Sequence, residues 1–167
     1  MRYENLVLIG MPAAGKTTVG RLLAQALGLE FLDTDELIER VNGKKLHEII
    51  AERGLAGFRA TEEAALLGLD VKRTLIATGG SVIYSEPGMR ALRRLGPVAF
   101  LNCPLPVLSR RVGDPTARGM VIAPGQSFAE LYEERLPLYR RYADVEIDCD
   151  ELPPEVVARR VRAALAL

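Results

Sequence analysis

The sequence predicts an α/β fold with a mostly parallel β-sheet. Short apolar runs alternate with longer segments of helical periodicity, which is typical of βαβ units whose helices cover both faces of a sheet. The first apolar run leads through a glycine-containing turn into a helical segment, an arrangement that forms ligand sites at the carboxyl edge of such sheets. With 167 residues, 49% of them apolar, the chain fits a single domain, residues 1–167, with its own core.

Five short segments are predicted as strands. Leu6–Ile9 is continuously apolar, so we expect it to be buried on both faces. The first three strands end at Gly10, Asp33 and Gly79, and ligands bind where parallel strands end. The predicted strands are 6–9, 30–33, 74–78, 97–101 and 145–148.

Helices are expected in the intervals. Gly28 ends the first helix because glycine is favoured just past a helix C-terminus, and Ser127 with Glu130 has the spacing of a capping box. Residues 113–126 are rich in glycine and proline and are predicted to form a mobile loop. The predicted helices are 17–27, 35–41, 46–53, 58–70, 87–95, 106–112, 127–142 and 153–167.

Composition argues against several classes of partner. The 22 basic and 22 acidic residues cancel, whereas proteins that bind nucleic acid or anionic membranes usually carry a basic excess. No apolar stretch approaches the length of a membrane span, and no signal peptide is recognised. Cys103 and Cys149 lack metal-site spacing and are expected to be free thiols. We therefore expect a cytoplasmic protein, and a monomer.

Residues 10–17 match the phosphate-binding pattern G-x-x-x-x-G-K-[ST]. Glycines let successive backbone N–H groups point at phosphate oxygens, and the following helix adds its positive end. Lys16 is expected to reach the β- and γ-phosphates, and the Thr17 hydroxyl to hold Mg²⁺. The alternative is a chance match, but the loop lies between a predicted strand and helix, as the motif requires. The predicted ATP contacts here are Gly10, Met11, Pro12, Ala13, Ala14, Gly15, Lys16, Thr17 and Thr18.

Further segments follow this loop in a recognisable order and spacing. They are Asp33-Thr-Asp35 with Ile38-Glu39, Gly57-Phe58-Arg59 with Glu62-Glu63, Ala77-Thr78-Gly79-Gly80, and Glu134-Arg135-Leu-Pro137-Leu-Tyr139 with Ala143-Asp144. Through them nearly the whole chain resembles the shikimate kinase family. The resemblance implies a P-loop kinase fold, with a five-stranded parallel sheet flanked by helices, a mobile lid at about 113–126 and a substrate-binding region at about 34–60. It also implies ATP-dependent phosphorylation of shikimate, with Mg²⁺.

The resemblance gives two aspartates different roles. Asp33 would lie close to Mg²⁺ through water, and Asp35 would accept hydrogen bonds from substrate hydroxyls and act as the base or orienter of the attacking oxygen. A helix N-cap is the alternative for Asp35.

Two arginines, Arg59 and Arg135, would converge on the substrate carboxylate, a task that suits planar guanidinium forks. Glu62, three residues after Arg59 on a predicted helix, is expected to hold that arginine in place. Surface charges are the alternative for both arginines. The backbone of Gly79, Gly80 and Ser81 would line the substrate.

The resemblance also assigns residues around the nucleotide. Arg118, in the predicted lid, would close over the phosphates and stabilise transition-state charge, with a solvated loop charge as the alternative. Arg110 or Arg111 would stack on adenine, and spacing to Arg118 favours Arg111. The predicted catalytic residues are Lys16, Asp35 and Arg118.

Two departures from the family pattern bear on the acceptor. Ser81 replaces the third of three usual glycines, which would narrow the pocket or add a hydrogen bond. The lid reads Arg118-Gly119-Met120-Val121 in place of Arg-Pro-Leu-Leu, and glycine for proline should make it more mobile. The alternatives kept open are a kinase for another hydroxy acid, such as gluconate, and a non-catalytic nucleotide-binding regulatory module.

Overall fold

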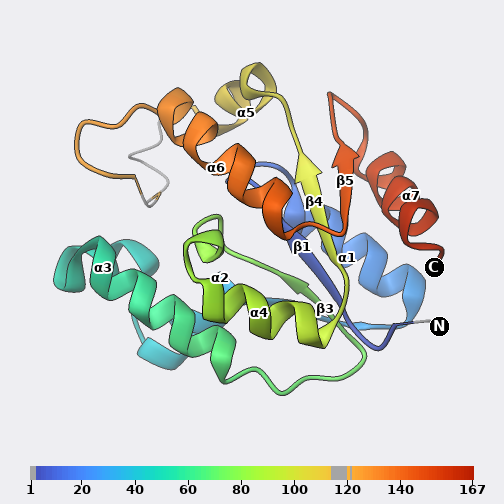
Figure 1. Ribbon diagram of the computed structural model, residues 1–167, viewed down its shortest axis with the longest axis horizontal. Helices are drawn as coiled ribbons and strands as arrows, with labels where there is room; N and C mark the ends of the chain where they lie inside the picture. Colours follow the sequence, from blue (N-terminus) through green and yellow to red (C-terminus); the bar gives the residue numbers. More distant parts are fainter. Residues whose placement is uncertain (1–2, 114–119, 121) are drawn as a thin grey trace.

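The fold is a five-stranded parallel sheet with helices on both faces (Figure 1). The computed structural model describes residues 3–113, 120 and 122–167. The strand order is β2-β3-β1-β4-β5 with every pairing parallel, which confirms the predicted fold class. The strands are β1 Leu6–Ile9, β2 Glu30–Asp33, β3 Thr74–Ala77, β4 Val98–Asn102 and β5 Val145–Asp148.

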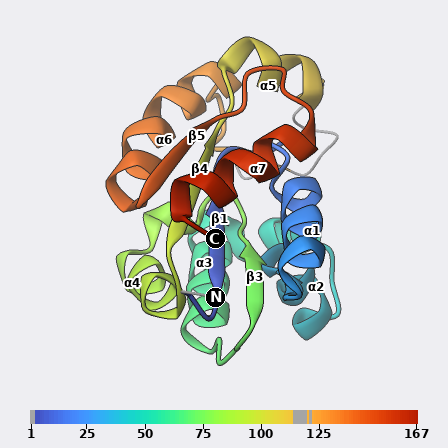
Figure 2. The same cartoon turned by 90° about the vertical axis from the view of Figure 1, so that its right-hand side faces the viewer.

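Seven α-helices and one 3₁₀ turn, η1, make up the rest of the described secondary structure. They are α1 Lys16–Leu27, α2 Thr34–Asn42, α3 Leu46–Leu67, η1 Val82–Tyr84, α4 Glu86–Leu95, α5 Leu105–Val112, α6 Phe128–Tyr142 and α7 Pro154–Leu165. Helices α1 and α7 pack together on one face of the sheet, whereas α4 and α6 lie on the other (Figure 2). This two-sided cover explains why β1 and β3 are buried at every residue.

The helix predictions differ from the structure at two places. The stretches expected at 46–53 and 58–70 form α3, which bends at Gly54 (φ 69°, ψ 179°) and ends at Leu67 before Gly68. The turn η1 was not predicted, because three residues are too few for a helical period to show. No helix in the described ranges is long and apolar enough to cross a membrane.

The central strand β1 fixes where a ligand can bind. From β1 the chain passes to β2 and β3 on one side and later to β4 and β5 on the other. The strand order therefore reverses at β1, and the crevice beyond the carboxyl end of that strand is the expected ligand site. The loop that leads from β1 into α1 lies at this crevice.

Candidate active site

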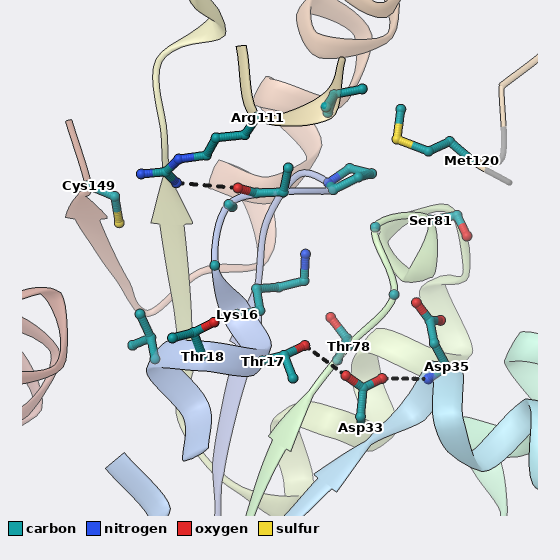
Figure 3. Close-up of a pocket in the computed structure, with 18 of the residues that line it drawn as sticks. Lys16, Thr17, Thr18, Asp33, Asp35, Thr78, Ser81, Arg111, Met120 and Cys149 are labelled. Carbon is teal, nitrogen blue, oxygen red and sulfur yellow. Dashed lines mark hydrogen bonds between the residues drawn. The ribbon is translucent and has the colours of Figure 1, made fainter. Parts of the chain in front are cut away.

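A cleft of about 760 Å³ opens at this carboxyl edge, a size that suits small-molecule sites. Figure 3 shows Lys16 and Thr17 in its middle, Arg111 and Cys149 toward one end, and Asp35 and Ser81 toward the other. The predicted site residues among its lining are Pro12, Ala13, Ala14, Gly15, Lys16, Thr17, Thr18, Asp33, Asp35, Gly79, Gly80, Ser81, Arg111 and Arg135.

The phosphate-binding loop depends on close backbone packing. Gly10 has φ +151°, and a Cβ there would lie 2.8 Å from the Leu101 carbonyl oxygen, so a side chain is excluded. Gly15 (φ +93°) caps α1 in the left-handed region. Met11 is buried in the core rather than exposed to the cleft. The motif glycines are therefore explained by sterics at the turn between β1 and α1.

Lys16 is the first residue of α1 and is folded over the loop. Its Nζ donates hydrogen bonds to the carbonyl oxygens of Gly10 (2.7 Å) and Met11 (2.8 Å). Burial lowers the pKa of Lys16 to about 8, although Asp35 and Asp33 oppose that shift. Phosphate oxygens placed here would restore the ammonium form by supplying opposite charge.

Asp33 joins the loop to β2. Its Oδ2 accepts a hydrogen bond from the Thr17 hydroxyl at 2.9 Å, and its Oδ1 accepts from the backbone N–H groups of Asp35 (3.0 Å) and Glu36 (3.4 Å). Asp33 is therefore the N-cap of α2. The alternative of an N-cap role for Asp35 is wrong, because Asp33 already fills it.

With the cap filled by its neighbour, Asp35 points into the cleft (Figure 3). Burial and the nearby Asp33 raise the pKa of Asp35 to about 6, and Lys16 partly offsets this. A carboxylate with a pKa close to neutrality is a better proton acceptor than an ordinary aspartate. The geometry thus allows Asp35 to serve as a base.

The turn after β3 forms the wall opposite the loop. A Cβ at Gly79 would lie 2.5 Å from Asp35 Oδ1 and 2.8 Å from Glu62 Oε1, so only glycine fits between these carboxylates. The Gly79 N–H donates to the Thr34 hydroxyl at 3.1 Å, so this backbone donor is already paired within the protein. Gly80 approaches Pro12 and Arg135, which a Cβ would meet at 3.0 and 2.9 Å.

Ser81 is buried, and its hydroxyl donates to Glu62 Oε2 at 2.7 Å. Of the two effects left open for this residue, the structure has the hydrogen bond. The other oxygen of Glu62, Oε1, is buried without a partner. Burial raises the pKa of Glu62 to about 7, and the Ser81 hydrogen bond opposes that rise.

The two predicted carboxylate-binding arginines occupy different positions. Arg135 is fully buried and lines the cleft. Arg59 is absent from that lining and lies over the Tyr84 ring, with its Cζ 4.0 Å from the ring centroid. The expected clamp of Glu62 on Arg59 is wrong: no ion pair joins them in the described structure, and Glu62 instead accepts from Ser81.

At the other end of the cleft the structure separates two candidate arginines. Arg110 is turned outward to an ion pair with Glu151. Arg111 lines the cleft and donates to the Ala13 carbonyl at 3.3 Å, with the Cys103 sulfur 3.5 Å away. Cys103 and Cys149 are buried and form no disulfide. Arg118 and half of the predicted lid lie outside the described residues.

Two tyrosines near the cleft were missed. The Tyr139 hydroxyl donates to the Gly80 carbonyl at 2.6 Å, and Tyr84 contacts both Arg59 and Arg135. Tyr139 belongs to a segment that was singled out, but nothing in its spacing pointed to Gly80. Only the packing of α6 on η1 and β4 brings these side chains to the site.

Similarity to known proteins assigns the chain to a family. The family model described as shikimate kinase matches residues 12–166. The chain belongs to the shikimate kinase family. A shikimate kinase from Thermodesulfovibrio yellowstonii is 38% identical over 161 residues, 95% of this chain and 92% of the relative. One from Saccharopolyspora erythraea is 41% identical over 158 residues, 93% and 90% of the two chains.

Solved structures agree with this assignment. The structure of shikimate kinase from Acinetobacter baumannii in complex with shikimate has a TM-score of 0.90 and 34% identity, and the match covers 99% of this chain and 94% of that one. As a shikimate kinase family member, the chain is an ATP-using phosphotransferase with an alcohol acceptor, as the sequence predicted.

Proposed function

We propose that this protein transfers the γ-phosphoryl group of ATP to a hydroxyl of shikimate, giving shikimate 3-phosphate. The observation that carries the proposal is the single cleft that joins the phosphate-binding loop to Asp35 and Arg135. A phosphoryl donor and a carboxylated alcohol would meet there with their reacting groups side by side. The neighbour solved in complex with shikimate supports this choice of acceptor.

On the nucleotide side, the loop N–H groups and Lys16 would hold the phosphates. Lys16 now donates to two loop carbonyls, so its ammonium group would turn from these to the β- and γ-oxygens. Arg111, beside Ala13, would lie against the adenine. Arg118 and the lid at about 113–126 stay predictions from the sequence, as does the acceptor region at about 34–60.

The donor set fits a magnesium ion. The Thr17 hydroxyl and the Asp33 carboxylate are hydrogen-bonded at 2.9 Å, and hydroxyl and carboxylate oxygens are the ligands that Mg²⁺ prefers. We assign Thr17 as a direct ligand and Asp33 as a partner through water. The bound ion would neutralise charge on the β- and γ-phosphates.

On the acceptor side, Asp35 would take the proton of the attacking hydroxyl. Its half-buried carboxylate at the cleft and its raised pKa support this role. Arg135, together with Arg59 on the face of the Tyr84 ring, would bind the acceptor carboxylate. Gly79, Gly80 and Ser81 would form the wall of the acceptor site.

The decisive experiment is an ADP-release assay with shikimate beside a panel of hydroxy acids that includes gluconate. We expect shikimate to give the highest kcat/KM, with Lys16→Ala as the inactive control. A folded, ATP-binding sample whose best acceptor is another acid would redirect the assignment within the same chemistry.

Light scattering tests the expected monomer against the chain mass of 18.3 kDa, and fractionation of expressing cells tests the expected cytoplasmic location.

A further inference from the structure

Tyr84, at the end of η1, contacts both arginines of the acceptor site. Its ring centroid lies 4.0 Å from Arg59 Cζ and 5.4 Å from Arg135 Cζ, both within the range of a cation–π interaction. Arg135 Nε also approaches the Tyr84 hydroxyl at 3.4 Å. That hydroxyl donates to Glu134 on α6, which fixes the direction of the ring.

Arg59 contacts the Tyr84 ring, and the carboxylates of Glu62 and Glu134 lie close enough to interact with its charge. Its Nε is buried without a hydrogen-bond partner, and Arg59 forms no ion pair within the described ranges, since Glu62 is held by Ser81. Two guanidinium groups this close repel one another. A ring whose face attracts each cation offsets part of that repulsion.

We propose that Tyr84 is a positioning residue of the acceptor site: its ring holds Arg59 and Arg135 together so that both guanidinium groups act on one carboxylate. The inference rests on the proposed function, because it assumes a carboxylated acceptor. The inference assigns to the Tyr84 ring the task of keeping the two guanidinium groups next to each other. The competing explanation is that Tyr84 only fills space between α3 and α6.

The test compares Tyr84→Leu, which removes the aromatic face, with Tyr84→Phe, which keeps it. Tyr142→Leu is the matched control, because it makes the same change at a tyrosine that contacts Arg141 (5.4 Å) outside the cleft lining. Tyr84→Met fills the space with a flexible side chain, so that a folding defect of one variant does not decide the result. Melting temperatures are recorded for all four.

The readout is the ratio of kcat/KM for the acid to kcat/KM for its methyl ester. Tyr84→Leu and Tyr84→Met should lower this ratio about tenfold through a raised KM for the acid, a value between those of an exposed and a fully desolvated cation–π contact. Tyr84→Phe should stay within about threefold of wild type, because it keeps the ring face and loses only the hydrogen bonds of the hydroxyl with Glu134 and Arg135. Tyr142→Leu should leave the ratio unchanged. Equal losses for acid and ester, or no loss, would overturn the inference.

The failure of this inference is separate from failure of the proposed function. The proposed function is judged on the wild type, by its turnover of shikimate. The inference is judged on the acid-to-ester ratio, measured with the best carboxylated acceptor of the panel. An unchanged ratio in Tyr84→Leu would remove the role of Tyr84 and leave the wild-type activity as it stands.

Discussion

At the scale of single residues, the cleft region holds two neighbouring carboxyl groups in surroundings that are largely shielded from water. Asp35 and Glu62 both approach Gly79, and burial raises the pKa of each. The two pKa shifts have different consequences, because Asp35 lines the cleft whereas Glu62 does not. The shift of Asp35 affects catalysis, and the shift of Glu62 affects the stability of the fold.

Asp35→Asn should remove the proton acceptor and keep the fold. We expect kcat to fall by about 10²–10⁴, with ATP affinity unchanged. In the wild type, kcat/KM should fall as pH drops below about 6, where Asp35 becomes protonated. The residual kcat/KM of the variant should not show this fall at low pH. Steady-state kinetics from pH 5 to 8 measure both. Near wild-type kcat in Asp35→Asn would assign the base elsewhere.

Glu62 should make the protein less stable as pH rises. Its folded pKa of about 7 exceeds the ordinary 4.5, so the folded state favours the protonated form, and the associated stability is lost between those two values. The loss amounts to about 3 kcal/mol. Glu62→Gln should abolish it, and urea unfolding at pH 5 and 8 measures the difference. Ser81→Ala should steepen the loss, because it removes a hydrogen bond that favours the carboxylate.

At the scale of elements, the bend in α3 separates the part that packs on α2 from the part that reaches the site. Gly54 adopts φ 69° and ψ 179°, a region that is essentially restricted to glycine. The residues on either side then keep helical geometry, which lets Ile49 and Phe58 join Ile38 in one small buried cluster. The bend thus fixes α3, which carries Arg59 and Glu62, against α2.

Gly54→Ala should destabilise the protein without a steric clash. Nothing lies within 4 Å of a Cβ built at this position, so the cost is backbone strain of about 1–3 kcal/mol. Gly68→Ala is the matched control at the C-terminal cap of the same helix, because Gly68 has φ −85°. Thermal unfolding should show a fall of roughly 2–4 °C per kcal/mol for the first variant only. Equal melting temperatures for the two variants would contradict the strain.

At the scale of the whole molecule, the sheet order brings distant segments to one edge. The loop after β1, Asp33 at the end of β2 and the glycines after β3 belong to adjacent strands. Helix α6, on the sheet face opposite α1, carries Arg135, which is 102 residues after Asp33. The ligand therefore bridges parts of the chain that are separate in sequence, and its binding should stabilise the whole fold.

ADP with Mg²⁺ should raise the melting temperature of the whole domain in a single unfolding transition. At a concentration one hundred times its Kd, a ligand adds about 2.7 kcal/mol of stability, which corresponds to roughly 5–10 °C for a chain of this size. Chelation by EDTA should reduce the shift, and Lys16→Ala should nearly remove it. Differential scanning fluorimetry gives all three values. A full shift in Lys16→Ala would place the nucleotide outside the loop.

The fold class, the strands and the phosphate-binding loop could be predicted from the sequence alone. These follow from local rules: the apolar runs of β1 and β3 are typical of buried parallel strands, and the spacing of Gly10, Gly15 and Lys16 meets the sterics of a phosphate loop. The family resemblance rested on the same kind of ordered local pattern. It therefore named Asp35 and Arg135 before the cleft that holds them was known.

The pairing of side chains around that cleft depends on tertiary packing. Helical spacing predicted that Glu62 would hold Arg59, but Ser81 is close enough to take the carboxylate, and Arg59 lies on Tyr84 instead. Spacing along one helix indicates which side chains of that helix could contact each other. The packing of η1 and α6 against α3 selects among them, because a buried hydrogen bond or ring contact forms only where another element approaches.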